Sequence, residues 1–144
     1  MTECIIADSM KVVYCGIVSM RYPMTIRGKV IQGSGRGRSL GTPTINVDPR
    51  SAPRDLQHGV YACFVTLDRT IMMGALHYGP RPVFHDSLSL EVHIIDAMIT
   101  EVPPSIEIEI IGRIRDIRHF ASKEELFLRI QTDITEVRGM LQGA

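Results

Sequence analysis

A short segment in the first third of the chain carries groups suited to holding a phosphate. Segment 33–46 reads Gly-Ser-Gly-Arg-Gly-Arg-Ser-Leu-Gly-Thr-Pro-Thr-Ile-Asn. Glycine lets the backbone come close to a ligand, arginine supplies a permanent forked cation, and successive backbone N–H groups form a concave anion site. We therefore interpret the segment as a phosphate-binding loop, although a glycine-rich loop that binds nothing has the same composition. The candidate residues are Gly33, Gly35, Arg36, Gly37, Arg38 and Gly41.

Two common phosphate-binding motifs do not fit this segment. A Walker A loop needs a glycine where Gln32 stands and a lysine where Arg38 stands, and it must open a helix. Leu40–Pro43 would break a helix instead, because proline restricts the residue before it. The dinucleotide-binding pattern fails as well, since Arg38 occupies the place of its third glycine.

Pro43 is followed by two side chains that could bind a metal ion. In an extended segment Thr44 and Asn46 point to the same side, because side chains alternate along a strand. Their hydroxyl and amide oxygens suit Mg²⁺, which takes few protein ligands and completes its shell with water and phosphate. The sequence thus predicts a divalent cation beside the phosphate-binding loop.

A second segment that could do chemistry is 88–96, where apolar and polar residues alternate. The alternation puts Glu91 and His93 on one face of a strand. They could simply form the solvated face of a half-buried strand. Alternatively, Glu91 is a general base that takes the proton of a hydroxyl group while phosphate is transferred to it. We interpret His93 as structural.

The elements that position these residues are mostly strands. Alternating or apolar runs predict strands at about 25–32, 60–67, 71–78, 88–96 and 106–111, with a hairpin turn at Asp68–Arg69. Ser122 and Glu125 form a capping box for a helix from Ser122 to Leu141. Its apolar stripe should pack on the sheet: Leu126, Ile130, Ile134, Val137 and Leu141. These patterns give a mainly β domain with one C-terminal helix.

Composition bounds the class of protein. The 144 residues carry a formal net charge of zero, which argues against a general nucleic-acid binder, and no apolar run reaches the length of a membrane span. The three cysteines show no disulfide or zinc pattern, and Cys63 should be a buried thiol. Residues 1–24 lack the features of a signal or transit peptide. We expect them to be an extension that adds an edge strand or covers one end of a domain formed by residues 25–144.

Beyond these patterns, several segments resemble the riboflavin kinase (flavokinase) family. The loop run Gly-x-Gly-Arg-Gly-x-x-Leu-Gly-x-Pro-Thr-x-Asn is similar to the signature of that family, and the likeness extends from about Thr25 to the C-terminus. Family-like segments are His58–Ala62, Arg81–Phe84, Leu90–Asp96 and Arg115–Phe120, with Ser122, Glu125 and Leu126 after them. The sequence departs from the family at Val83, at Ala97, and by lacking the Tyr-Gly that usually follows the glutamate strand.

The resemblance implies a fold and a reaction. The fold would be a closed six-stranded antiparallel Greek-key barrel with a C-terminal α-helix. The reaction would be ATP-dependent phosphorylation of riboflavin at the ribityl 5′-hydroxyl, giving FMN and ADP, with Mg²⁺ or another divalent cation. We expect a cytoplasmic monomer that uses no nucleic acid and no membrane. The chain has neither room for a preceding nucleotidyltransferase domain nor its His-x-Gly-His motif, so we expect FMN synthesis without FAD synthesis.

The resemblance also assigns roles to residues of this chain. The loop residues named above, together with Pro43, would bind ATP, Thr44 and Asn46 would hold the metal, and Glu91 would be the base. Arg115, Arg118 and Phe120 would lie near the flavin, where an aromatic ring and two cations could hold a planar ring and a phosphate. On structural grounds alone, Phe120 would instead pack beside the helix and Arg118 would be solvated.

Two other functions were weighed against the kinase. One is a flavin-binding or regulatory module on the same barrel, which would have no chemical need for Thr44, Asn46 and Glu91. The other is a barrel that binds single-stranded nucleic acid. The zero net charge and the presence of only four tyrosines and four phenylalanines argue against that role.

Overall fold

The computed structural model describes residues 4–7, 10–15, 18–31, 43–80 and 87–143, and before Tyr22 it describes the backbone path alone. In chain order the strands and helices are β1 (Cys4–Ala7), β2 (Met10–Cys15), β3 (Val18–Tyr22), β4 (Met24–Ile31), β5 (Thr44–Val47), η2 (Pro49–Ser51), β6 (Gly59–Leu67), β7 (Thr70–Pro80), β8 (Leu88–Ile95), β9 (Ser105–Arg115) and α1 (Lys123–Gln142).

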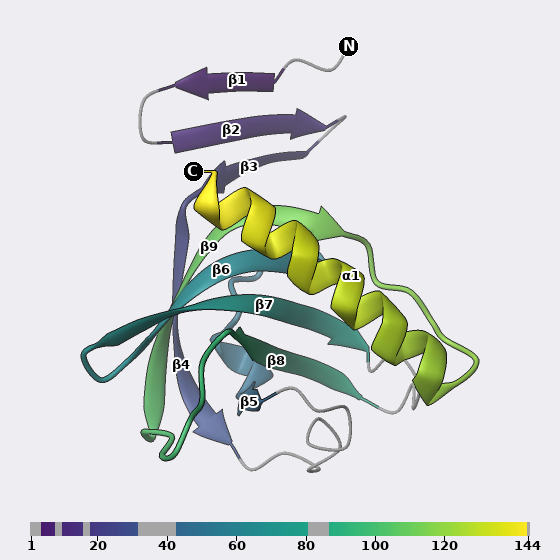
Figure 1. The fold of residues 1–144 in the computed structure, drawn as a ribbon. Helices are drawn as coiled ribbons and strands as arrows, with labels where there is room; N and C mark the ends of the chain where they lie inside the picture. The colour runs from purple at the N-terminus through teal and green to yellow at the C-terminus, as the bar shows by residue number, and fades with distance from the viewer. Residues whose placement is uncertain (1–3, 8–9, 16–17, 32–42, 81–86, 144) are drawn as a thin grey trace.

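Strands β4 to β9 close into a barrel in the order β4-β5-β8-β7-β6-β9 (Figure 1). All neighbouring barrel strands are antiparallel. Consecutive strands β6, β7 and β8 lie side by side, and β9 returns to pair with β6, which is the Greek-key arrangement. The predicted six-stranded antiparallel Greek-key barrel is therefore confirmed.

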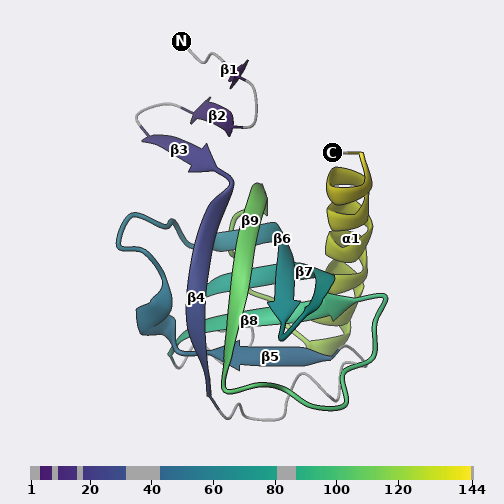
Figure 2. The ribbon, with the colours of Figure 1, turned by 90° about the vertical axis from the view of Figure 1, so that its left-hand side faces the viewer.

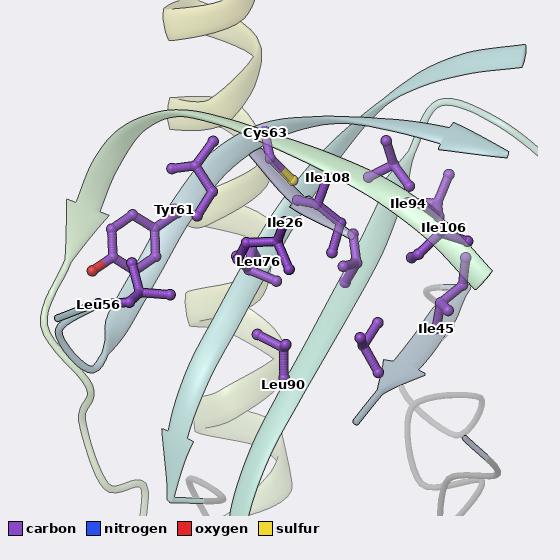
Figure 3. Packing of buried hydrophobic residues seen from close by; sticks show 14 of the residues in the cluster. Ile26, Ile45, Leu56, Tyr61, Cys63, Leu76, Leu90, Ile94, Ile106 and Ile108 are labelled. Carbon is purple, nitrogen blue, oxygen red and sulfur yellow. The ribbon is translucent and has the colours of Figure 1, made fainter. Parts of the chain in front are cut away.

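The interior of the barrel is filled by alternate residues of its strands, as period-two patterning requires (Figure 3). Strand β6 shows this clearly, because Tyr61, Cys63 and Val65 point into the core and are fully buried. The Cys63 Sγ lies 3.3 Å from the carbonyl oxygen of Gly74, and burial raises the pKa of the thiol. The prediction of a buried Cys63 is confirmed.

Helix α1 lies on the outer face of the barrel, across β6, β7 and β9 (Figures 1 and 2). Small residues in the strands let it come close: a Cβ added to Gly112 would lie 2.6 Å from the Sδ of Met140. The Ser122 hydroxyl accepts from the Glu125 N–H at 3.2 Å, which confirms the predicted cap. The predicted apolar stripe is buried against the sheet: Leu126, Ile130, Ile134, Val137 and Leu141.

Strands β1 to β3 form a separate three-stranded antiparallel sheet beyond one end of the barrel (Figures 1 and 2). They pair with one another, whereas an extra edge strand on the barrel was one of the two expectations for residues 1–24. The chain passes from β3 into β4 at Tyr22, whose ring is buried in the barrel core 6.5 Å from that of Tyr61. In the described parts of the chain, no helix has the length and hydropathy of a membrane span.

Candidate active site on the outer face of the barrel

The pairing of β5 with β8 brings two of the predicted sites together. Thr44 lies opposite His93, and Asn46 lies opposite Glu91. The intervening Ile45 belongs to the barrel core, so the four polar residues project from the outer face, where each is half-buried. The prediction that Thr44 and Asn46 share one side of a strand is confirmed, and Glu91 with His93 lies beside them.

The ring of His93 forms a hydrogen bond with the hydroxyl of Thr44. The Oγ1 of Thr44 lies 3.0 Å from the Nδ1 of His93. Burial lowers the pKa of His93 to about 4, so the ring is neutral at pH 7 and can accept a hydrogen bond from the hydroxyl. This contact fixes the side chain that the sequence marks as a metal ligand.

On its other side, Glu91 is paired with a histidine that the sequence analysis did not single out. His77 of β7 lies opposite Glu91, and Val60 of β6 lies opposite His77. Since Val60 is paired in turn with Arg115 of β9, one row crosses five strands from Asn46, a predicted metal ligand, to Arg115, a predicted flavin residue. The signal for His77 is its place next to Leu76 in a strand: neighbouring side chains point to opposite faces, and Leu76 belongs to the core.

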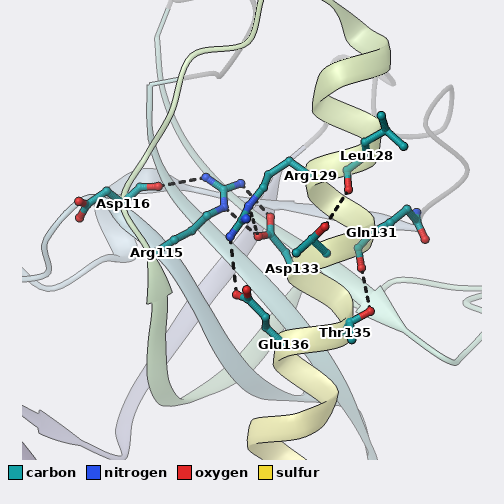
Figure 4. A network of polar contacts seen from close by, with 9 residues as sticks. Arg115, Asp116, Leu128, Arg129, Gln131, Asp133, Thr135 and Glu136 are labelled. Atoms are coloured by element: carbon teal, nitrogen blue, oxygen red, sulfur yellow. Dashed lines mark hydrogen bonds and ion pairs between the residues drawn. The ribbon is translucent and has the colours of Figure 1, made fainter.

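Arg115 is held by the helix. Its Nε and Nη2 donate to the two carboxylate oxygens of Asp133 at 2.8 Å each (Figure 4). The side chains of Arg115 and Asp133 are only 11% and 5% exposed. Arg129 forms ion pairs with the same Asp133 carboxylate at 3.1 Å and with the carboxylate of Glu136 at 3.6 Å. This network fastens α1 to the end of β9 and fixes the position of the Arg115 guanidinium.

Phe120 lies between the other two predicted flavin residues. The guanidinium carbons of Arg115 and Arg118 are 5.8 and 5.9 Å from the centre of its ring, within reach of a cation–π interaction. Phe120 also packs against the core under α1, which agrees with the expectation that it packs beside the helix. The three residues are thus neighbours, and Arg118 is the exposed member.

A cavity of about 390 Å³ opens between the end of β8 and α1. Pro43 forms part of its wall, so it adjoins the start of β5 and the predicted metal ligands. Asp96 and Arg138 close one side through two hydrogen bonds of 2.8 and 2.5 Å. Its lining is Pro43, Ile94, Ile95, Asp96, Ala97, Met98, Gln131, Ile134 and Arg138.

Most of the predicted ATP-binding residues lie outside the described part of the chain. They are Gly33, Gly35, Arg36, Gly37, Arg38 and Gly41. Pro43 is the member of that set that the structure describes. Among the described residues no three His, Cys, Asp or Glu side chains cluster as a metal site. The neutral oxygens of Thr44 and Asn46 fit a cation that keeps water and phosphate in its shell.

A riboflavin kinase family model, described as Flavokinase, matches residues 20–141. The chain belongs to the riboflavin kinase family. An RNA-binding riboflavin kinase of Bacillus subtilis is 34% identical over 112 residues, covering 76% of this chain and 48% of that protein. A bifunctional riboflavin kinase/FMN adenylyltransferase of Escherichia coli is 34% identical over 114 residues, covering 78% of this chain and 36% of that protein.

The fold comparison agrees with the family. The crystal structure of riboflavin kinase from Trypanosoma brucei superposes with a TM-score of 0.57 at 25% identity, covering 83% of this chain and 80% of that one. The chain spans less than half of the length of the two bacterial relatives. The match therefore concerns the barrel and its helix, where the candidate site lies.

Proposed function

We propose that this chain catalyses ATP-dependent phosphorylation of riboflavin, transferring the γ-phosphoryl group to the ribityl 5′-hydroxyl to give FMN and ADP. The observation that carries the proposal is the cross-strand pair Asn46–Glu91. The pairing supports the proposal because the amide of Asn46, a proposed metal ligand, and the carboxylate of Glu91, the proposed base, come from directly opposite positions on adjacent strands.

Glu91 is the general base in this scheme. Its carboxylate accepts the proton of the 5′-hydroxyl as that oxygen bonds to phosphorus. The strand fixes the backbone of Glu91 and the face from which its side chain projects, since Leu90 and Val92 on either side are anchored in the core at 1% and 0% exposure. A rigidly placed base loses little free energy to orientation during the reaction.

Thr44 and Asn46 are the proposed protein ligands of a divalent cation, with Mg²⁺ the natural candidate. When bound, such an ion neutralises negative charge on the phosphates. His93 orients the Thr44 hydroxyl by accepting a hydrogen bond from it at 3.0 Å, so that an oxygen lone pair remains available to the ion. Outer partners of this kind commonly orient metal ligands.

ATP would be held on the β5 side of Glu91. Gly33, Gly35, Arg36, Gly37, Arg38 and Gly41 are the proposed phosphate-binding residues. Pro43 links this loop to the cavity beside α1, whose lining of apolar side chains with the Asp96–Arg138 pair could accept the adenine base. The flavin would lie on the opposite side, toward β9.

Arg115, Arg118 and Phe120 would contact the flavin. Arg118 is exposed and close to Phe120, so it is free to move toward a product phosphate. Arg115 donates two hydrogen bonds to Asp133. It would therefore act on the flavin as a positive charge in a fixed position at the wall of the site.

The decisive test is a chromatographic assay with riboflavin, ATP and Mg²⁺. FMN and ADP should form in equal amounts, and a chelator should stop both. Binding of riboflavin without turnover would favour the flavin-binding module instead. Absence of both binding and turnover would contradict the proposal altogether.

A further inference from the structure

His77 carries a buried nitrogen with unused hydrogen-bonding capacity. The residue is only 7% exposed, and its Nε2 has no hydrogen-bond partner within the described parts of the chain. The buried Nε atoms of Arg113 and Arg129 also have no hydrogen-bond partner in these parts of the chain. Their guanidinium groups, however, reach the carboxylates of Asp116 and Asp133 at 2.6 and 3.1 Å. The Nε2 of His77 has no comparable compensation among the described residues.

The protonated nitrogen of the ring can be assigned from its contacts. Ser89 donates its hydroxyl proton to the carbonyl oxygen of Gly79 at 3.3 Å. The Ser89 oxygen also lies 3.5 Å from the Nδ1 of His77. With the one hydroxyl proton of Ser89 given to Gly79, we assign the ring proton to Nδ1, which then donates in this second contact. The Nε2 atom is then a bare acceptor.

The surroundings keep the ring neutral. Burial, followed by the nearby His93 and Arg115, lowers the pKa of His77 to about 3. Glu91 faces it from β8, and His58 is the remaining ionisable neighbour. A ring in this state is a poor base at pH 7 but a good hydrogen-bond acceptor.

An unsatisfied buried acceptor costs free energy, and folded proteins retain few of them. Each one that persists needs an explanation, and functional sites are places where proteins depart from such rules. His77 occupies such a place, in the same cross-strand row as Glu91 and Arg115. It therefore lies on the side of the proposed base that faces the proposed flavin residues.

We propose that Nε2 of His77 accepts a hydrogen bond from a hydroxyl of the ribityl chain next to the one that is phosphorylated. The inference rests on the proposed function and names a further specificity residue for it. Glu91 takes the proton of the terminal hydroxyl, and His77 recognises the polyhydroxylated chain that carries it. The contact requires the atoms that cover Nε2 to move aside when the flavin binds.

Two substitutions separate the nitrogens of the ring. In His77→Asn the amide lies near the position of Nδ1, so the contact with Ser89 can be kept while the group at Nε2 is lost. In His77→Gln the amide reaches the position of Nε2. We expect about a fivefold to tenfold rise in KM for riboflavin in His77→Asn, as for one lost neutral hydrogen bond. The rise should be largely reversed in His77→Gln, with kcat changing less in both.

A modified substrate makes the test specific. The probe is a flavin whose side chain is a plain 5-hydroxypentyl group, which keeps the reacting hydroxyl and lacks the others. The wild-type chain should bind it more weakly than riboflavin in a fluorescence titration. His77→Asn should lose most of this discrimination. Glu109→Gln, at an exposed position of β9, is the control and should retain it.

Each outcome decides between the interpretations. If His77→Asn, shown to be folded by circular dichroism, weakens both flavins by the same factor, His77 is structural and the inference fails alone. The inference also fails if His77→Asn discriminates between the two flavins as strongly as the wild type does. If the wild-type chain binds neither flavin, the proposed function and the inference fail together.

Discussion

Asn46 on β5 and Glu91 on β8 are direct cross-strand partners. The Cβ atoms of such partners are typically about 5 Å apart, so the proposed metal ligand and the proposed base can reach the same phosphoryl group. Neither residue depends on a loop for its position. The core residues next to them in each strand fix both side chains on the outer face of the barrel.

Replacing Glu91 by glutamine should lower kcat by about 100-fold or more, because a positioned general base contributes at least that factor. The amide has nearly the shape of the carboxylate, so the melting temperature should stay close to that of the wild type. Steady-state assays of FMN formation give the rate. Glu109→Gln is the matched control, since Glu109 is exposed on β9; equal rates in the two variants would remove Glu91 from the role of base.

Thr44 offers a test of the metal site with two variants of similar size. Thr44→Ser keeps the hydroxyl that lies 3.0 Å from His93, whereas Thr44→Val keeps the shape and removes it. The Mg²⁺ concentration for half-maximal activity should rise about tenfold or more in Thr44→Val, by analogy with the loss of other metal-site groups. It should change little in Thr44→Ser. Binding of Mn²⁺ with ADP, followed by electron paramagnetic resonance, should show the same order.

Asp133→Ala should lower the free energy of unfolding by about 3 kcal/mol, because it leaves the buried Arg115 without its counter-charge. Urea denaturation measures the change, with the exposed Glu124→Ala as the control on the same helix. The double variant Arg115→Met with Asp133→Leu should be more stable than Asp133→Ala, since the charge of Arg115 is removed together with its partner and Arg129 keeps Glu136 at 3.6 Å. A double variant that is less stable than Asp133→Ala would contradict this account of the pair.

Stability should fall with acid partly through His77. Burial lowers its pKa from 6.5 to about 3, so the unfolded chain binds a proton that the folded chain excludes. The contribution of His77 is therefore complete above pH 6.5 and is lost as the pH falls toward 3. In urea denaturation at pH 7 and pH 5, His77→Gln should lose less stability over this interval than the wild type.

Much of the fold could be predicted from local patterns. Alternating or apolar runs located β4 and β6 to β9, and the capping box with its apolar stripe located α1. Closure of the barrel came only from the family resemblance, since periodicity within a strand does not say which strand lies beside it. The N-terminal sheet was missed because the apolar runs before Tyr22 do not reveal that they pair with one another.

The site was predictable where neighbours in sequence are neighbours in space. Thr44 and Asn46 are two residues apart, so alternation alone put them together. His77 and Glu91 lie on different strands, and the sequence between β7 and β8 does not reveal the register in which these strands pair. Asp133 was also missed, because a carboxylate on a helix is usually solvated, and only its partner on β9 explains its burial.

The strand order also constrains how the chain acquires its structure. Strand β4 pairs with β9 from Met24 opposite Ile110 to Lys29 opposite Ser105. During synthesis, β4 is therefore the first barrel strand to appear and β9 is the last, so the seam between them cannot form until all six exist. The hairpin β6–β7 can form early because its partners are adjacent. Closing the seam requires a long loop of chain to be ordered, and we expect that step to limit the folding rate.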